Sequence, residues 1–282
     1  MPKKSPEDGD SSSASVRLRQ VLRDSPAERG WQRSREIELG SRSMGFAALG
    51  FLTLVPLLVV VSAADPEHGR GFAQWLGDGL GVSGEAREQV GQLFARPGQV
   101  LETTTAFGLA ALAVFGLSFG AAVQTGYEKI WELPSARWYA RWRQVLWLAV
   151  LVGTLYLTAT TTLWRHSAAG TLAATLSAVL FFGWSQRMLL GGRIAWSAVL
   201  PGAVLTALGL LGLRVFSRLV FSPLIASSAV TYGPFGTFLV VQSWLVGVGV
   251  VVFGGALAGR LLHEELPRVA QVLRPRAWRR RP

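Results

Sequence analysis

The sequence predicts an all-α, polytopic integral membrane protein, a helix bundle of about six transmembrane helices with both termini cytoplasmic. Between residues 133 and 263 the 282-residue chain has no aspartate or glutamate, yet the stretch is rich in Leu, Val, Ala, Gly, Phe and Trp. The few charges within it are arginines, which lie mostly between long apolar runs. A soluble protein of this length would scatter acids over its surface, so the predicted solvent is the bilayer.

Six apolar runs predict the transmembrane helices. Each approaches or exceeds the ~20 residues that a helix needs to cross ~30 Å of hydrocarbon. Helix is the expected conformation because an unpaired backbone amide in lipid costs several kcal/mol. A tight hairpin at Arg165 and His166 is expected between the third and fourth runs, the alternative being one long kinked helix. The runs are 45–63, 104–123, 145–164, 168–186, 194–213 and 235–259.

The membrane domain is predicted to span residues 45–262, between two polar ends. Residues 1–44 are rich in Ser, Arg and Glu and predict a disordered cytoplasmic head, and residues 263–282 predict a basic cytoplasmic tail. Apolar side chains of residues 65–103 fall on one side of two short helices, which predicts an amphipathic outer segment. Residues 61–64 resemble a signal-peptide cleavage site, but the long polar head favours a retained transmembrane helix.

Basic residues orient the bundle. If the amino terminus is cytoplasmic, the inner segments hold 22 Lys and Arg residues and the outer segments hold 6. The positive-inside rule then places both termini inside. Tryptophans near the ends of the runs fit headgroup level, notably Trp142, Trp184 and Trp196. Trp244 lies ten residues into the last run, so we expect it to face protein with its indole N–H seeking a partner.

The composition argues against several function classes. The net charge of +11 comes from residues that flank the runs, so topology explains it and no nucleic acid partner is expected. His68, His166 and His263 fall on three different segments, so we expect no catalytic residues, no metal site and no cofactor. No cysteine is present to supply a thiolate. No acid lies within the six runs, which weakens a proton relay.

Spacing of small residues predicts where helices approach closely. Gly116 and Gly120 are four apart, as are Gly255 and Gly259, and small residues let backbones come together. Pro56 and Pro201 lie inside the first and fifth runs, where the missing N–H and the ring would kink the helix. These positions are predicted to pack or bend helices.

Arg214 and Arg218 are the main exception to the positive-inside pattern. They lie four apart at the outer end of the fifth run, so both guanidiniums share one helix face. The simpler interpretation is that they snorkel to the headgroups. The sharper hypothesis is that they bind an anionic lipid headgroup or substrate beside Tyr232 and the turn at residues 233–236, gripping its oxygens with planar donors.

Short motifs follow one another in a fixed order over about residues 40–262. The first half has Ala47-Ala48-Leu49 through Pro56-Leu57-Leu58, then Phe119-Gly120-Ala121-Ala122-Val123-Gln124 with Tyr127 and Ile130-Trp131. The second half has Pro201-Gly202-Ala203, Tyr232-Gly233-Pro234-Phe235-Gly236, Trp244 and Gly254-Gly255. In order and spacing these motifs resemble those of the YihY/BrkB membrane proteins. The resemblance implies a bacterial inner-membrane protein linked to envelope integrity, once also labelled ribonuclease BN.

Two departures limit what the resemblance carries over. Glu128 stands where many members have Asn, and Gly254-Gly255-Ala256 stands where many have Gly-Ala-Glu. The second change removes the family's best candidate for an intramembrane acid. Together with the spacing argument, the motifs give these positions for helix packing or kinks: Pro56, Gly116, Gly120, Pro201, Gly202, Gly233, Gly236, Trp244, Gly255 and Gly259.

The resulting expectation is a multi-pass plasma-membrane protein for envelope integrity that binds or transports lipids or other amphiphiles. Its expected partners are membrane lipids, anionic ones included, and a second copy of the chain or another membrane protein. A structural scaffold for other membrane proteins is the alternative function. A ribonuclease is the distant third, since nothing in the residues supports it.

Overall fold

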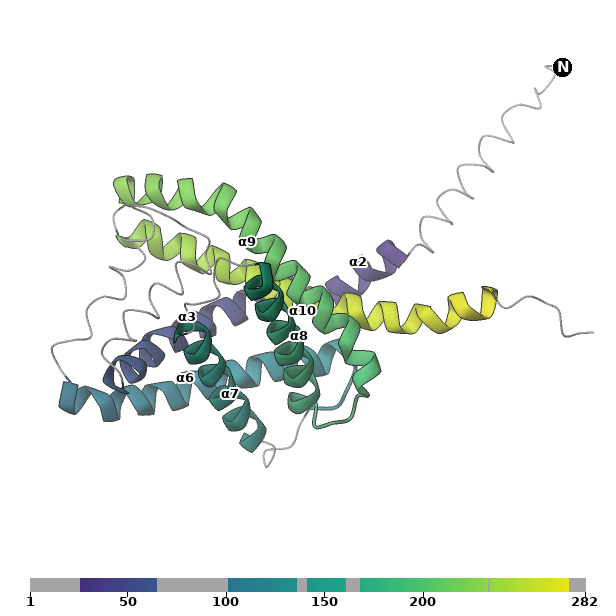
Figure 1. The fold of residues 1–282 in the computed structure, drawn as a ribbon, viewed down its shortest axis with the longest axis horizontal. Helices are drawn as coiled ribbons and strands as arrows, with labels where there is room; N and C mark the ends of the chain where they lie inside the picture. Colours follow the sequence, from purple (N-terminus) through teal and green to yellow (C-terminus); the bar gives the residue numbers. More distant parts are fainter. Residues whose placement is uncertain (1–25, 65–100, 136–140, 161–167, 233, 274–282) are drawn as a thin grey trace, which may run out of the picture.

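The computed structural model describes residues 26–64, 101–135, 141–160, 168–232 and 234–273, and these residues are all-helical (Figure 1). A short helix precedes six long ones, and the six long helices coincide with the six apolar runs. The helices are α2 (Pro26–Glu36), α3 (Leu39–Ala64), α6 (Leu101–Ile130), α7 (Arg141–Thr160), α8 (Ala168–Leu189), α9 (Trp196–Tyr232) and α10 (Pro234–Leu273).

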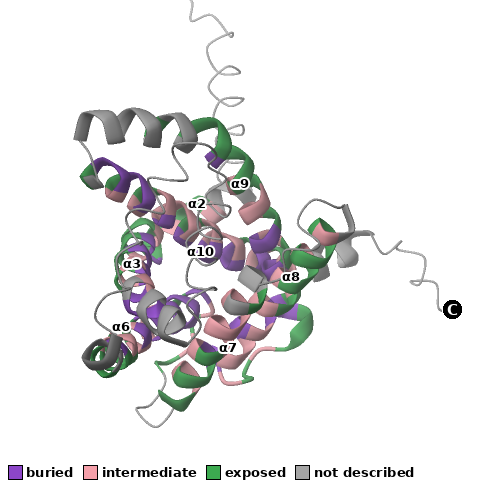
Figure 2. Cartoon of the chain, turned by 60° about the vertical axis from the view of Figure 1, so that its left-hand side comes forward, coloured by how far each residue is buried: buried purple, intermediate pink, exposed green. Residues whose placement is uncertain are grey.

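Three of the described helices are long and apolar enough to cross a membrane by length and composition, over Ala106–Ile130, Trp196–Val220 and Phe235–Glu265. Helix α10 is central to the bundle, because it contacts α2, α3, α6 and α9. Helices α7 and α8 contact each other, α7 also packs on α6, and α8 also packs on α6 and α9. Buried residues gather along α3, α6 and α10, as Figure 2 shows.

Aromatic rings form the centre of the core. Phe46 of α3 contacts Phe119 of α6, with ring centroids 4.9 Å apart, and Phe253 of α10, with centroids 5.8 Å apart. Both pairs are edge-to-face, the arrangement that ring quadrupoles favour. Tyr127 and Trp147 belong to the same buried cluster. The core therefore joins α3, α6, α7 and α10 at one level of the bundle.

The α9–α10 interface is built on small residues. A Cβ at Gly259 would overlap the backbone of Gly202, and a Cβ at Gly255 would lie 2.9 Å from the Cα of Thr206. A Cβ at Gly202 would in turn lie 3.3 Å from the Cα of Ala256. The backbones of the two helices are thus in direct contact, as the spacing of Gly255 and Gly259 predicts.

The other glycine pair lies between α6 and α7. A Cβ at Gly116 would lie 2.5 Å from Leu148 Cδ2, and one at Gly120 would lie 3.4 Å from Gln144 Cβ. The neighbours here are side chains rather than backbone, so α7 is held at a greater distance than α10 is from α9. The contact between α9 and α10 at Gly255 and Gly259 is therefore closer than the contact between α6 and α7 at Gly116 and Gly120.

The remaining packing candidates fall at helix interiors and at one junction. Pro56 is buried inside α3, and Pro201 lies in the second turn of α9. The turn was predicted at residues 233–236. In the structure α9 ends at Tyr232 and α10 begins at Pro234, so residues 234–236 belong to α10. Gly236 is buried in the first turn of α10, and Gly233 lies outside the described residues. Proline is well placed at a helix start, where its missing N–H has no intrahelical partner.

The outward faces of the helices are apolar, the reverse of a soluble protein. Leu172, Leu176 and Leu180 follow one face of α8 and are 65%, 63% and 68% exposed. Leu219 of α9 is 73% exposed, and Phe107 of α6 is 76% exposed. In water such stripes would be large exposed apolar patches, which soluble monomers rarely carry. Lipid is the solvent that matches them, and the chain is a helical membrane protein.

Several helix ends differ from the predicted ones. Residues 26–44, predicted as disordered, form α2 and the start of α3, because Ile37 is buried in the core and Gly30 packs on Leu261. Helix α9 continues 19 residues beyond Leu213 to Tyr232. Helices α7 and α8 are separate, as a hairpin requires, but their connection at 161–167 lies outside the described residues. So do residues 65–100, most of the predicted outer segment.

Candidate functional site

A cavity of about 440 Å³ lies inside the bundle, between α7 and α8 on one side and α6, α9 and α10 on the other. We call it the central cavity. Its wall is mostly apolar; besides the hydroxyls of Thr154, Thr171, Thr175 and Ser177, its polar side chains lie at two levels. Lining residues are Phe46, Phe119, Val123, Tyr127, Trp147, Leu151, Thr154, Leu155, Thr171, Ala174, Thr175, Ser177, Ala178, Phe181, Phe182, Ser185, Ala207, Leu210, Leu211, Leu213, Arg214, Trp244, Val248 and Val252.

One level is a hydrogen-bonded group from three helices. The indole Nε1 of Trp147 donates to the Ser185 hydroxyl at 2.6 Å, and the Tyr127 side chain is hydrogen-bonded to the same serine. Tyr127 and Ser185 are 1% exposed, so the group is enclosed by the core. The group joins α6, α7 and α8 and forms a polar part of the cavity wall.

The other level contains Arg214 and Trp244. A Cβ at Gly247 would lie 3.2 Å from Leu213 Cδ1, so these two residues lie at the same level of the antiparallel helices α10 and α9. Arg214 and Trp244 are one and three residues away from them, so their positions along the helix axes differ by less than about 5 Å. Arg214 is exposed while lining the cavity, and no described residue forms a salt bridge with it. The indole Nε1 of Trp244 is buried and has no acceptor among the described residues. Trp244 thus faces protein as expected, but the expected partner is absent from the described part.

The structure does not bring Tyr232 beside the two arginines. All three residues are on the continuous helix α9, and Tyr232 is 18 residues beyond Arg214, about 27 Å along the axis. Arg218 is exposed and does not line the cavity. The sequence-based site of Arg214, Arg218 and Tyr232 therefore reduces to Arg214 at the cavity wall.

A buried polar chain connects α6 to α7 and to the α8–α9 connection. Gln144 donates to Gln124 Oε1 at 3.0 Å, and Gln124 donates to Glu128 Oε1 at 3.0 Å. Arg193 lies 3.5 Å from the same Glu128 oxygen and also donates to the carbonyl of Pro134 at 3.2 Å. The six runs contain no acid, but α6 continues past Val123, and Glu128, which lies beyond that run on the same helix, is 4% exposed.

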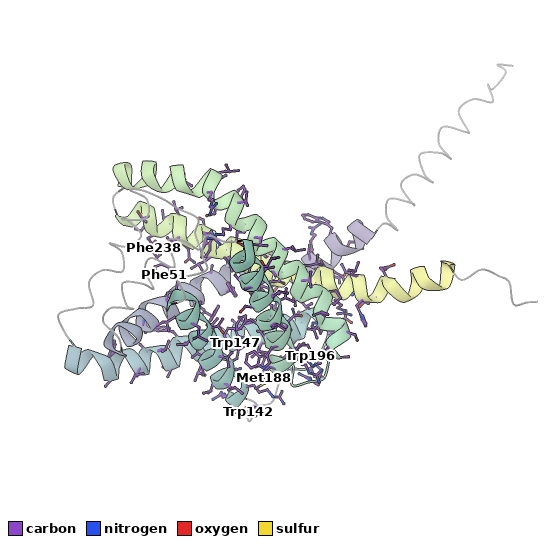
Figure 3. The ribbon with its side chains drawn as sticks, in the orientation of Figure 1. Phe51, Trp142, Trp147, Met188, Trp196 and Phe238 are labelled. Carbon is purple, nitrogen blue, oxygen red and sulfur yellow. The ribbon has the colours of Figure 1, made fainter. Side chains whose placement is uncertain are left out.

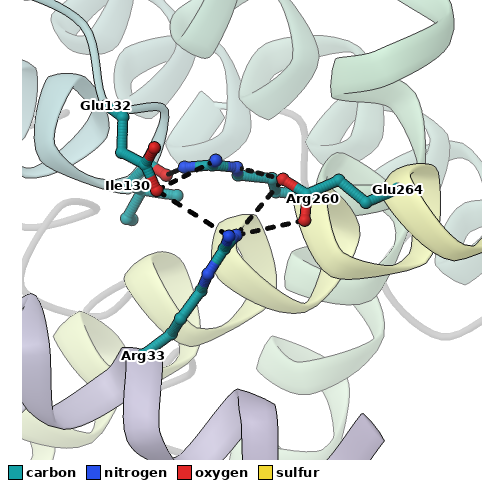
Figure 4. A network of polar contacts seen from close by, with 5 residues as sticks. All are labelled: Arg33, Ile130, Glu132, Arg260 and Glu264. Atoms are coloured by element: carbon teal, nitrogen blue, oxygen red, sulfur yellow. Dashed lines mark hydrogen bonds and ion pairs between the residues drawn. The ribbon is translucent and has the colours of Figure 1, made fainter.

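Figure 4 shows a second charged network, where α2, the end of α6 and α10 meet. Arg260 donates to Glu264 Oε1 at 2.7 Å and to the carbonyl of Ile130, and it lies 3.0 Å from Glu132. Arg33 lies 3.1 Å from Glu264 Oε2 and 3.9 Å from Glu132. The cation of Arg260 therefore satisfies a terminal carbonyl of α6, where the helix dipole favours positive charge.

These two networks define one end of the molecule, which we call the charged end. It consists of residues 26–37, 131–135, 190–195 and 260–265. Contacts of Arg193 with Pro134, and of Arg260 and Arg33 with Glu132, join all four segments. The segments were predicted on the sequence to lie on the cytoplasmic side, and here they are neighbours.

No described histidine lines the central cavity. His263 is exposed on α10, three residues after Arg260, while His68 and His166 lie outside the described residues. Within the described ranges, no three His, Asp or Glu side chains gather in a way that could hold a metal ion. The chemistry available at the central cavity is hydrogen bonding, apolar contact and one guanidinium.

Comparison with known proteins gives one family. Neither the curated proteins nor the solved structures include a significant match to this chain. The sequence matches the family described as virulence factor BrkB over residues 31–280, which is most of its length and includes the central cavity and all of the charged end except residues 26–30. The matched region contains the residues on which the resemblance to YihY/BrkB proteins rested. The chain belongs to the BrkB family of membrane proteins.

Proposed function

We propose that this protein is a six-span plasma-membrane protein, with both termini in the cytoplasm, that serves envelope integrity by binding or moving lipids or other amphiphiles. The observation that carries the proposal is the central cavity. Its volume of about 440 Å³ falls within the range of small-molecule sites. Such sites are lined mainly by apolar side chains, with a few polar groups that fix orientation.

The cavity suits a ligand with one polar end and one apolar end, because the Trp147, Ser185 and Tyr127 side chains already hydrogen-bond one another and Arg214 is the charged group on the wall. Phe181, Phe182 and Val248 line the wall and offer apolar contact to a chain. Arg214 offers a planar set of donors that can bind two oxygens of a phosphate or carboxylate group. A neutral apolar solute would leave this cation unused, so the favoured ligand is an anionic amphiphile.

A matched pair of alanines on α8 tests the proposal. Ala178 lines the central cavity, whereas Ala173 is exposed and does not. Ala178→Phe fills cavity volume and is expected to lower the amount of lipid that copurifies with the protein, measured by mass spectrometry. Ala173→Phe adds the same ring on a lipid-facing surface and should retain lipid like the parent. Equal retention by both variants would contradict the proposal and favour a scaffold for other membrane proteins.

Reconstitution separates binding from movement. Vesicles containing the protein and whichever lipid is enriched should show transbilayer movement of that lipid, and the Ala178→Phe variant should slow it. Arg214→Gln and Arg214→Lys test the headgroup contact in the same assay, with Arg218→Gln as the matched control. A guanidinium that only anchors the helix would tolerate lysine and would give no difference between Arg214→Gln and Arg218→Gln.

The proposed topology is supported by the convergence of four predicted inner segments at the charged end. Because the chain has no cysteine, single cysteines can be introduced without background. Cysteines at Ser135 and Gly192 should be protected from an impermeant thiol reagent in intact cells, while a cysteine at Ser83 should react. The reverse pattern would invert the orientation.

We also propose that the protein acts without hydrolytic chemistry. Rigorously purified protein should not cut RNA, since no pair of acid and base groups is expected at one site. Nuclease activity that copurifies at constant specific activity and disappears in His166→Ala or His263→Ala would overturn this statement.

A further inference from the structure

A second cavity, of about 280 Å³, lies at the charged end between the start of α7 and the α8–α9 connection. It shares no lining residue with the central cavity. Arg143 of α7 and Arg187 of α8 both line it, together with Trp142, Trp184 and Trp196. We call it the arginine pocket.

Neither guanidinium in the arginine pocket has a carboxylate partner among the described residues. Arg187 donates to the carbonyl of Ile194 at 2.7 Å and lies over the ring of Trp196, 5.4 Å from its centroid. Arg143 lies over the ring of Trp142, 5.8 Å from the centroid. The two half-buried guanidiniums line the same pocket, and their positive charges repel each other. An anion bound between them would remove this repulsion.

The backbone of Gly191 makes room for Arg143. Gly191 has a φ of 69°, in the left-handed region that favours glycine, and it follows the last turn of α8. A Cβ at this position would collide with the guanidinium of Arg143. The conformation of the α8–α9 connection and the position of the arginine therefore depend on each other.

The aromatic residues place the arginine pocket at a membrane surface. Trp142 is 56% exposed and Trp196 is 47% exposed, and both lie near Met188 at one end of the bundle (Figure 3). Exposed tryptophans are typical of the headgroup level, where the ring meets acyl chains and the N–H meets water. A ligand that reaches the pocket beside these rings is expected to carry acyl chains.

We infer that the arginine pocket binds the phosphate group of an anionic lipid, held between the Arg143 and Arg187 guanidiniums with its acyl chains against Trp142 and Trp196. Phosphate oxygens accept from two guanidiniums without any proton transfer. The site is separate from the cavity of the proposed function. It rests on that proposal only in requiring that the charged end lie at a membrane surface.

Native mass spectrometry of the full-length protein in detergent tests the inference, with phosphatidylglycerol and phosphatidylcholine as probes. Phosphatidylglycerol should bind the parent more tightly than phosphatidylcholine. Arg143→Gln should weaken phosphatidylglycerol binding about tenfold, the effect of losing a charge-assisted hydrogen bond. Arg141→Gln removes the same charge two residues away, from an exposed position that does not line the pocket, and should leave binding within about twofold of the parent.

A second variant distinguishes a loss of lipid binding from a loss of folding. Gly191→Ala keeps both arginines but displaces Arg143, so it should also weaken phosphatidylglycerol binding, and parallel thermal unfolding reports whether the bundle is intact. Equal binding by Arg143→Gln, Gly191→Ala and the parent would overturn the inference. Equal losses in Arg143→Gln and Arg141→Gln would also overturn it, because they indicate a diffuse positive surface.

Inorganic phosphate distinguishes the two sources of the anion. An excess of phosphate should not displace phosphatidylglycerol, since it lacks the contacts of acyl chains with the tryptophans. Displacement would show a site for free phosphate and overturn the lipid assignment. In the Ala178→Phe background, where the central cavity is filled, Arg143→Gln should still weaken phosphatidylglycerol binding about tenfold, so failure of the central-cavity proposal and failure of this inference give different results.

Discussion

Two parts of the bundle are packed differently. Helices α3, α6, α9 and α10, which we call the frame, contain most of the buried residues, and the backbones of α9 and α10 touch at Gly202 and Gly259. Helices α7 and α8, which we call the pair, are packed more loosely. Trp147 is the one buried residue of α7 in the described part, and along α8 no described residue before Gly183 is buried.

The difference explains where the central cavity is. Close backbone contact leaves no space between α9 and α10, whereas α7 is separated from α6 by the side chain of Leu148. Without a hydrophobic driving force in lipid, helices associate mainly through such packing. A wall that is held by fewer contacts is easier to move, so a ligand would enter on the side of the pair.

The largest expected effect is in the frame. Gly259→Ala places a Cβ on the backbone of Gly202, and because backbone cannot rotate away, the helices must separate. We expect a loss of about 3 kcal/mol in the free energy of unfolding, read as a lower melting temperature in detergent. Gly254→Ala is the matched control, since nothing lies within 4 Å of its Cβ, and it should be neutral or stabilising. Equal effects would remove the distinction between the two parts.

A smaller effect is expected at the charged end of the frame. Arg260→Gln removes the cation that joins Glu132, Glu264 and the Ile130 carbonyl, and the Arg260 side chain is 12% exposed. The expected cost is about 2 kcal/mol, because partly buried acceptors lose a charged partner. Lys129→Gln removes an exposed cation from the last turn of α6 and should cost little. A neutral Arg260→Gln would mean that Arg33 alone suffices at this end.

The smallest effect is expected between the frame and the pair. Gly116→Ala brings a Cβ to 2.5 Å from Leu148 Cδ2, at the end of a flexible side chain that can change rotamer. The cost should be below about 1 kcal/mol in the same melting assay. Gly153→Ala on α7 meets nothing within 4 Å and provides the baseline. A cost as large as that of Gly259→Ala would show that the pair is as firmly packed as the frame.

Hydropathy predicted which segments are helical but not where the helices end. The six runs coincide with α3 and α6 to α10 because burial in lipid selects both apolarity and helix. Helix α9 continues past Arg214 and Arg218 to Tyr232, and arginine and serine are tolerated in a helix. Its passage through Pro223 was not predictable, because proline removes a backbone N–H and usually ends or kinks a helix. Helix α2 was missed because its contacts with α10 are distant in sequence.

The residue types of the two sites could be predicted from the sequence, but not which of those residues lie next to one another in the fold. Gln124, Tyr127 and Glu128 share the inward face that Gly116 and Gly120 define, by spacings of three and four, and this pattern could have revealed the buried acid. Tryptophans were predicted at headgroup level and basic residues on the inner side, and three tryptophans and two arginines line the arginine pocket from α7, α8 and α9. Convergence of that kind depends on tertiary packing, which one sequence does not encode locally.

Helix α10 has a mechanical consequence. Its 40 residues extend about 60 Å, twice the ~30 Å of the hydrocarbon layer, and Pro267 lies near its carboxyl end. Val248 and Val252, on the cavity wall, and Arg260 and Glu264, at the charged end, are parts of the same helix. A push or twist applied at Arg260 or Glu264 is transmitted along backbone hydrogen bonds to the cavity wall, whereas Pro267, which has no N–H to donate, interrupts that ladder beyond Glu264. Load on the charged end can thus reach the interior of the bundle through α10 itself.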